Sequence, residues 1–173
     1  MKIILFLLIL LSLLYTCSWK THDQISKYFD SNGKPISEKE FQKNGENGKI
    51  EIVYWDENGQ NIHELVEYRN GKENGKFLQW AEDGFKLTLG QYTNGKKNGR
   101  WIYRYRNGTK DVAQYKDDQK HGKVINFDSY GRKRMEEKYK EGKQHGHTIY
   151  WDEKGNIVLE EIWADDNLKN KIK

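Results

Sequence analysis

The sequence contains very little cysteine or proline, with one residue of each among 173. Its single cysteine, Cys17, excludes an internal disulfide, so no disulfide cross-link stabilises the folded domain. Because Pro35 is the only proline, the rest of the chain lacks the residue that most strongly interrupts β-strands. Aliphatic side chains are scarce after residue 16, which argues against a large helical domain and against a conventional α/β enzyme.

Aromatic residues and glycine are abundant where aliphatic residues are scarce. A low aliphatic content indicates disorder when the net charge is high. Here the formal net charge is only +4, aromatic residues make up 13% of the chain, and there are 16 glycines. This composition predicts one polar, aromatic-rich folded domain behind a hydrophobic leader.

We interpret residues 1–16 as a signal peptide. Lys2 precedes an apolar stretch from Ile3 to Leu14, which is shorter than the roughly 20 residues that span a bilayer. Leu14 stands three residues before Cys17, as in bacterial lipoprotein signals, so we expect lipidation at Cys17 and a membrane anchor at the cell envelope. An ordinary cleaved signal and an uncleaved anchor are the alternatives.

Aromatic residues and glycines recur with a period of about 24 residues, which indicates a repeat architecture. The first five members of one aromatic column are each followed seven residues later by glycine. This column consists of Phe41, Tyr68, Tyr92, Tyr115, Tyr139 and Trp163. A second motif begins with an aromatic residue and ends in glycine three or four residues later. Its copies begin at Phe29, Trp55, Trp80, Tyr105, Phe127 and Trp151.

Two turns in each repeat leave two segments with the length of β-strands. Asn-Gly pairs such as Asn70-Gly71 predict two-residue turns that need a positive φ at both positions. The sequence therefore predicts an all-β fold class of tandem antiparallel β-hairpin repeats of about 24 residues. We expect a tether at 17–27, the repeat domain at 28–163 and a polar tail at 164–173.

The apolar residues predict which side of the sheet is packed. Leu78 and Trp80 stand two residues apart and therefore share one face of a strand, as do equivalent pairs in later repeats. We expect one packed face and one solvated face. The residues of the return strands expected on the packed face are Leu89, Val112, Met135 and Leu159.

The repeated Y-x-x-G-K-x-x-G pattern resembles the MORN-repeat family, in the variant found in YwqK-like antitoxin proteins. Residues 68–75, 92–101 and 139–146 carry the resemblance, which covers about residues 28–163. It implies hairpins laid side by side in one elongated, twisted meander sheet, and binding or scaffolding as the function.

Residues that could suggest catalysis or metal binding are better explained by turns. His121 and His145 precede a turn glycine and are interpreted as residues tolerant of positive φ. No cysteine or carboxylate recurs with them, or with His147, at metal-ligand spacing. Three aspartates follow an aromatic residue and are interpreted as Asx-turn residues: Asp56, Asp128 and Asp152. We expect no catalytic residue, no metal and no cofactor, and therefore a non-enzymatic protein.

A candidate binding surface combines aromatic residues with lysines beside the turns. The aromatics serve either as core or as a ligand-binding ladder, and the lysines either meet an anionic surface or protect exposed strands. The candidate residues are Trp55, Trp80, Trp101, Tyr103, Trp151, Lys72, Lys96 and Lys143. We expect a protein partner and a scaffolding role, with no nucleic acid because the chain is exported. An antitoxin or immunity function and binding of a cell-wall glycan are the alternatives.

Overall fold

The computed structural model describes residues 25–43, 47–56 and 58–172. The expected signal peptide, Cys17 and most of the expected tether lie outside these residues. Within them, no helix is both long enough and apolar enough to cross a bilayer.

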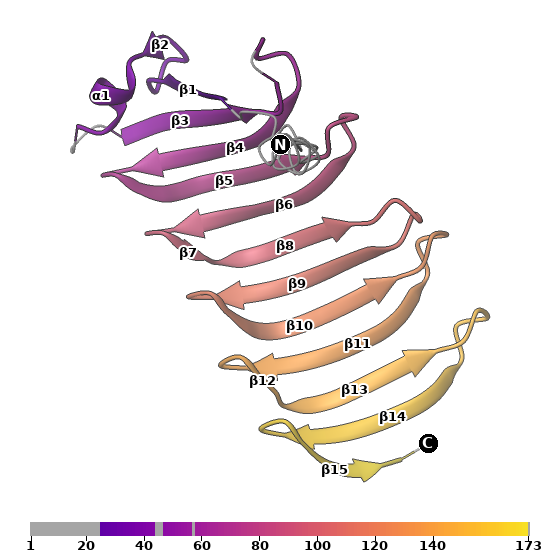
Figure 1. Ribbon diagram of the computed structural model, residues 1–173. Helices are drawn as coiled ribbons and strands as arrows, with labels where there is room; N and C mark the ends of the chain where they lie inside the picture. Colours follow the sequence, from indigo (N-terminus) through magenta and orange to yellow (C-terminus); the bar gives the residue numbers. More distant parts are fainter. Residues whose placement is uncertain (1–24, 44–46, 57, 173) are drawn as a thin grey trace, which may run out of the picture.

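The described residues form one open antiparallel sheet of fifteen strands, with one short helix at its N-terminal end (Figure 1). The predicted all-β hairpin fold is confirmed. The elements are β1 (Ile25–Phe29), β2 (Pro35–Ile36), α1 (Glu38–Phe41), β3 (Asn47–Tyr54), β4 (Ile62–Arg69), β5 (Lys72–Trp80), β6 (Lys86–Thr93), β7 (Lys96–Lys97), β8 (Gly99–Arg104), β9 (Lys110–Lys116), β10 (Gln119–Phe127), β11 (Lys133–Lys140), β12 (Lys143–Gln144), β13 (Gly146–Trp151), β14 (Ile157–Ala164) and β15 (Asn167–Lys171).

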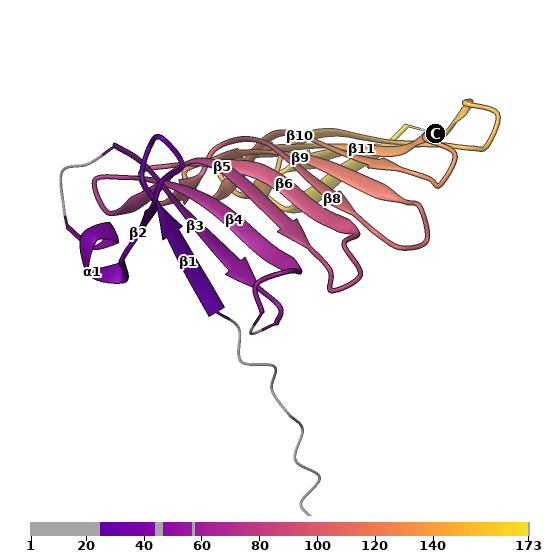
Figure 2. The same ribbon diagram turned by 90° about the horizontal axis from the view of Figure 1, so that it is seen from above.

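From β3 to β15, neighbouring strands in the sheet follow one another in the sequence, and β1 and then β2 continue the sheet beyond β3. Short strands β7 and β12 pair only with β6 and β11. The molecule is therefore elongated across its strands, and Figure 2 shows the strong twist that accumulates along it.

The two kinds of turn lie at opposite ends of the strands, and the two rows of turns are called here the tight-turn edge and the wide-turn edge (Figure 1). The tight-turn edge carries the two-residue turns between β4 and β5 and their equivalents. Asn70 and Gly71 have φ values of 51° and 71°, and Asn94 and Gly95 have 52° and 78°, as predicted for primed turns. The wide-turn edge carries the aromatic-to-glycine turns, such as the one between β5 and β6.

Successive tight turns are hydrogen-bonded to one another. The Gly95 amide donates to the Glu73 carbonyl of the preceding turn at 2.8 Å. The side chain that precedes the second glycine of each repeat contacts the next tight turn along the sheet. Asn98 Oδ1 accepts a hydrogen bond from the Asp117 amide at 3.3 Å, and His121 Nδ1 accepts one from the Glu141 amide at 3.4 Å. The expectation for His121 and His145 is therefore wrong. Neither residue has a positive φ, and each instead contacts the following turn.

Strand alternation and register define two faces. The tyrosine face carries the aromatic column from Tyr68 to Trp163, whose members after Tyr68 pair with glycines such as Gly75. It also holds the best-buried cluster, made of Val66, Phe77 and Trp101 with partly buried tyrosines around it.

Gly90, the one glycine outside both turn patterns, lies beneath Trp101. A Cβ atom on Gly90 would overlap the indole ring, and Ala113 pairs with Trp101 from the other side. Because two small residues flank it, the Trp101 side chain is only 1% exposed.

The opposite face is named the lysine face for the basic residues described below. A ladder of partly buried aliphatic residues crosses its strands, each being the cross-strand partner of the next. The ladder is Ile52, Leu65, Leu78, Leu89, Ile102, Val112 and Ile125. Most of the buried side chains lie on the tyrosine face, among them Phe77 and Trp101, so the tyrosine face is the better packed of the two. Leu89, which was expected on the packed face, lies instead in the ladder of the lysine face. Met135 and Leu159 lie on the tyrosine face, because they pair with Asn126 and Tyr150.

The ends of the sheet also differ from the expected boundaries. Phe41 belongs to α1, not to a strand, and its ring packs 4.6 Å from that of Tyr28 and 5.0 Å from that of Tyr68. At the other end, the segment expected to be a polar tail contains β15, which pairs with β14. β1 begins at Ile25, within the expected tether.

Candidate binding surface

Charged side chains are segregated between the two faces. Within the described strands, the carboxylates on the lysine face are Glu67, Glu136 and Glu160. The basic residues there are far more numerous: Lys27, Arg69, Lys72, Lys76, Lys86, Lys96, Arg100, Arg104, Lys110, Lys116, Lys123, Lys133, Lys138, Lys140 and Lys143.

Much of this positive charge faces solvent. Lys76, Arg100 and Lys138 are exposed on interior strands. Lys123 and Lys133 both pair with Glu136, at 2.8 and 2.7 Å, so one carboxylate is shared between two ammonium groups. The lysine face therefore keeps a net positive potential.

Carboxylates dominate the tyrosine face, and several are partly desolvated. Burial raises the pKa of Glu64, and the nearby charges of Glu51 and Glu73 raise it further. Burial likewise raises the pKa of Glu137. The pKa of Tyr139 is raised to about 12, first by burial and then by the charge of Glu137.

The lysines of the tyrosine face are engaged within the fold. Lys97 Nζ lies 4.3 Å from the centre of the Trp101 ring, and Lys120 Nζ lies 4.7 Å from that of Tyr139. These cation–π contacts hold both lysine side chains against the rings of their own face.

A second set of cation–π contacts lies on the lysine face. Each places an ammonium group over an aromatic ring, which limits the freedom of the lysine side chain. The pairs, with distances from Nζ to the ring centre, are Lys27–Tyr54 at 4.8 Å, Lys86–Trp80 at 5.6 Å, Lys110–Phe127 at 4.5 Å and Lys133–Trp151 at 5.0 Å.

The predicted surface residues do not form one surface. Those on the lysine face are Trp80, Trp151, Lys72, Lys96 and Lys143. Trp101 and Tyr103 lie on the tyrosine face. Trp55 follows β3, where its indole donates to the Trp80 carbonyl at 3.2 Å and its ring lies 4.1 Å from that of His63.

Sequence reasoning missed a hollow of about 390 Å³ at the wide-turn edge. Arg104 and Lys110 are cross-strand partners that line it, together with Phe85 and Tyr130. The Tyr130 side chain is 83% exposed. Nη1 of Arg104 is buried and has no hydrogen-bond partner. Arg104 is an even number of residues from Ile102, and Lys110 is an even number from Val112. This spacing in the sequence indicates that both cations share the face of the aliphatic ladder.

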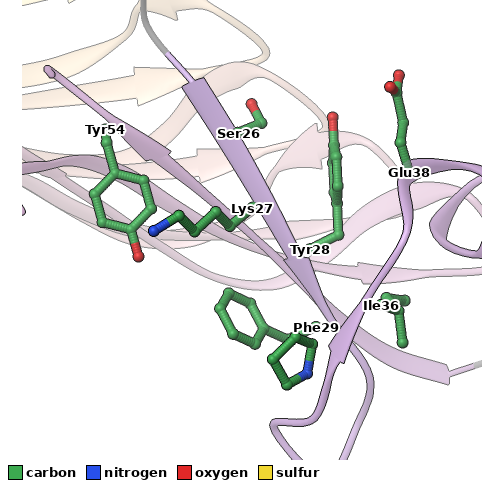
Figure 3. A pocket seen from close by; sticks show the side chains of 8 residues that line it. Ser26, Lys27, Tyr28, Phe29, Ile36, Glu38 and Tyr54 are labelled. Carbon is green, nitrogen blue, oxygen red and sulfur yellow. The ribbon is translucent and has the colours of Figure 1, made fainter. Parts of the chain in front are cut away.

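A hollow of about 610 Å³ lies around β1 at the N-terminal edge (Figure 3). The ammonium group of Lys27 extends toward the Tyr54 ring, and Glu38 of α1 stands on the far side.

The turn aspartates act as predicted. Oδ1 of Asp128 accepts hydrogen bonds from the amides of Tyr130 and Arg132, and Oδ1 of Asp152 accepts from those of Lys154 and Asn156. Asp56 makes equivalent bonds, and those from the backbone of its own turn hold its pKa below the usual range. In the part of the chain that the structure describes, no three histidine, cysteine or acidic residues are placed to hold a metal ion.

Comparison with known proteins finds neither a matching family model nor a matching curated protein.

Proposed function

We propose that this protein is a non-enzymatic interaction or scaffolding module of the cell envelope, and that it binds a negatively charged partner through the lysine face. The segregation of charge between the two faces carries the proposal. The resemblance to MORN repeats and the leader, with Cys17 as the expected lipidation site, support the binding role and the location.

The positions of the lysines favour binding over protection against aggregation. Protective lysines are needed on edge strands, whose backbone groups lack partners. Lys76 and Lys138 lie on β5 and β11, which are paired on both sides. Their charge therefore has no edge to protect and is free to act on a partner.

Two triple variants with the same change in net charge test the proposal. The first replaces Lys72, Lys96 and Lys143 on the lysine face with glutamine. The second replaces Lys34, Lys39 and Lys154, which are exposed but lie in the β1–β2 turn, in α1 and in the β13–β14 turn.

We expect the first variant to retain much less of the envelope material that co-purifies with the full chain, and the second to retain it. Circular dichroism would confirm that both variants fold. Equal retention by the first variant and the wild type would contradict the proposal, and equal losses in both variants would show an effect of net charge alone.

A further inference from the structure

We propose that the partner of the lysine face is a linear anionic polysaccharide, which lies across the strands and is anchored at the hollow lined by Arg104, Lys110 and Tyr130. This inference rests on the proposed function and specifies the chemistry of the partner.

The anchor is a hollow lined by two cationic side chains, Arg104 and Lys110. Nη1 of Arg104 is buried and has no hydrogen-bond partner, so no protein acceptor neutralises this end of the guanidinium group. Lys110 lines the same hollow with its ammonium group over Phe127. The carboxylate in the lining, Asp128, is already paired with Arg132 at 2.7 Å and bonded to its own turn. An anionic group in the hollow would therefore meet two cations and one compensated carboxylate.

Tyr130 supplies a surface for a sugar ring beside these cations. Its side chain is the most exposed of the large apolar residues. The Arg132 guanidinium lies 4.8 Å from the ring centre, which holds positive charge next to the ring. A saccharide unit offers an apolar C–H face to the tyrosine while its acidic substituent reaches Arg104. A simple anion offers the charge without this apolar surface.

Further cations continue the site across the sheet. Arg104 pairs with Lys110, Lys110 with Phe127, and Phe127 with Lys133, whose ammonium group lies over Trp151. Equivalent positions of successive hairpins are two strands apart, a step of about 9.6 Å. A regularly substituted polymer can therefore meet several of these cations in succession.

The twist of the sheet favours a chain over a flat or rigid partner. Adjacent strands are rotated by about 20–25° in typical sheets, and the twist is evident along this molecule (Figure 2). A membrane or a rigid protein surface can touch only a few strands of such a face at once. A linear polymer can follow the row as it turns.

Binding of the full chain to polygalacturonate and to dextran sulfate tests the inference, with neutral dextran as the uncharged control. We expect binding to at least one anionic polysaccharide, weakening as salt is added, and none to dextran. Arg104→Ala should raise the Kd about tenfold because it removes a charged, forked donor. Tyr130→Ala should raise it by a smaller factor, and Lys34→Ala should leave it unchanged.

Failure to bind either polymer, or an unchanged Kd in Arg104→Ala, would overturn the inference. So would equal or tighter binding to polyglutamate, single-stranded DNA or anionic lipid vesicles at matched charge. These outcomes leave the proposed function standing if the lysine-face triple variant still loses its envelope partner. Retention of that partner by the triple variant would instead overturn the proposed function itself.

Discussion

Gly90 and Trp101 show at the scale of single residues how one layer of sheet builds a core. The indole ring is 1% exposed although no second layer covers it. It is enclosed by neighbours on its own face, among them Phe77, Tyr92 and Tyr115, with ring centres 5.3, 5.1 and 6.1 Å away. The missing side chain at Gly90 provides the space that the ring occupies.

Gly90→Ala should therefore lower the free energy of unfolding by about 1–3 kcal/mol, the usual cost of overpacking. Urea denaturation would measure the change. The matched control is Gln91→Ala, an exposed position on the other face of the same strand, which should change the stability by less than about 0.5 kcal/mol. In a Trp101→Leu background the cost of Gly90→Ala should shrink, since the two residues share one space. Equal effects in both backgrounds would contradict the packing argument.

Glu64 allows a prediction about pH. Because burial and neighbouring carboxylates raise its pKa in the folded state, the folded protein binds this proton more tightly than the unfolded chain. The ionised side chain therefore destabilises the fold as pH rises through that pKa. Glu64→Gln should stabilise the protein at pH 7, and its advantage should disappear below about pH 3.5, under the ordinary glutamate pKa.

The measurement is the difference in urea midpoint between Glu64→Gln and the wild type across this pH range. The turn aspartates with lowered pKa values make the stability depend on pH in the opposite direction. They are present in both proteins, so their contribution cancels in the difference between the two urea midpoints. Glu82→Gln, in the exposed β5–β6 turn, serves as the control. A pH-independent difference would show that the Glu64 charge is not the cause.

At the scale of elements, the tight turns join one hairpin to the next. Asp118 occupies a position where three other repeats have glycine, and its φ of 67° lies in the region that favours glycine. Its carboxylate compensates, because Oδ1 accepts a hydrogen bond from the Lys97 amide of the preceding turn at 2.8 Å. Asp166 makes the same bond to the Gln144 amide.

Asp118→Ala should lower the free energy of unfolding by about 2–3 kcal/mol, because it keeps the left-handed backbone and loses the hydrogen bond. Asp118→Asn retains an acceptor and should stay close to the wild type, while Asp118→Gly should fall between the two. Thermal denaturation of the three variants would establish the order. A loss in Asp118→Asn as large as in Asp118→Ala would mean that charge, not the bond, matters.

The elements also show what the sequence could predict. Asn-Gly pairs and the aromatic period predicted the hairpins, because both are local signals. The face of Met135 was predicted wrongly. Met135 is an even number of residues from Tyr139, so both lie on the tyrosine face, whereas Leu89 is an odd number of residues from Tyr92 and lies on the lysine face. Helix α1 was also missed, although Ser37 and Glu40 form a capping box. The hollow at Arg104 brings together residues from three turns, which no local pattern could indicate.

At the scale of the whole molecule, the equivalence of repeats predicts that one of them can be removed. Deletion of residues 116–139 would join Tyr115 to Lys140 and bring Val112 opposite Ile149, in place of Glu136. We expect a shorter sheet with cooperative unfolding and a smaller dependence on urea, since less surface is buried. Deletion of 116–138 would shift the register by one residue and exchange the faces of every later side chain, so that variant should lose cooperativity. Equal behaviour of the two deletions would contradict the repeat register.

The separation of charge between the faces gives each stretch of the sheet an electric dipole perpendicular to its local plane, and the twist changes this direction along the molecule. A net charge of +4 alone would attract the protein weakly to an anionic matrix, in any orientation. The dipole adds a torque that turns the lysine face toward the matrix before contact. Productive encounters should therefore be faster than the net charge suggests, and their rate should fall steeply with ionic strength as screening shortens the range of that orientation.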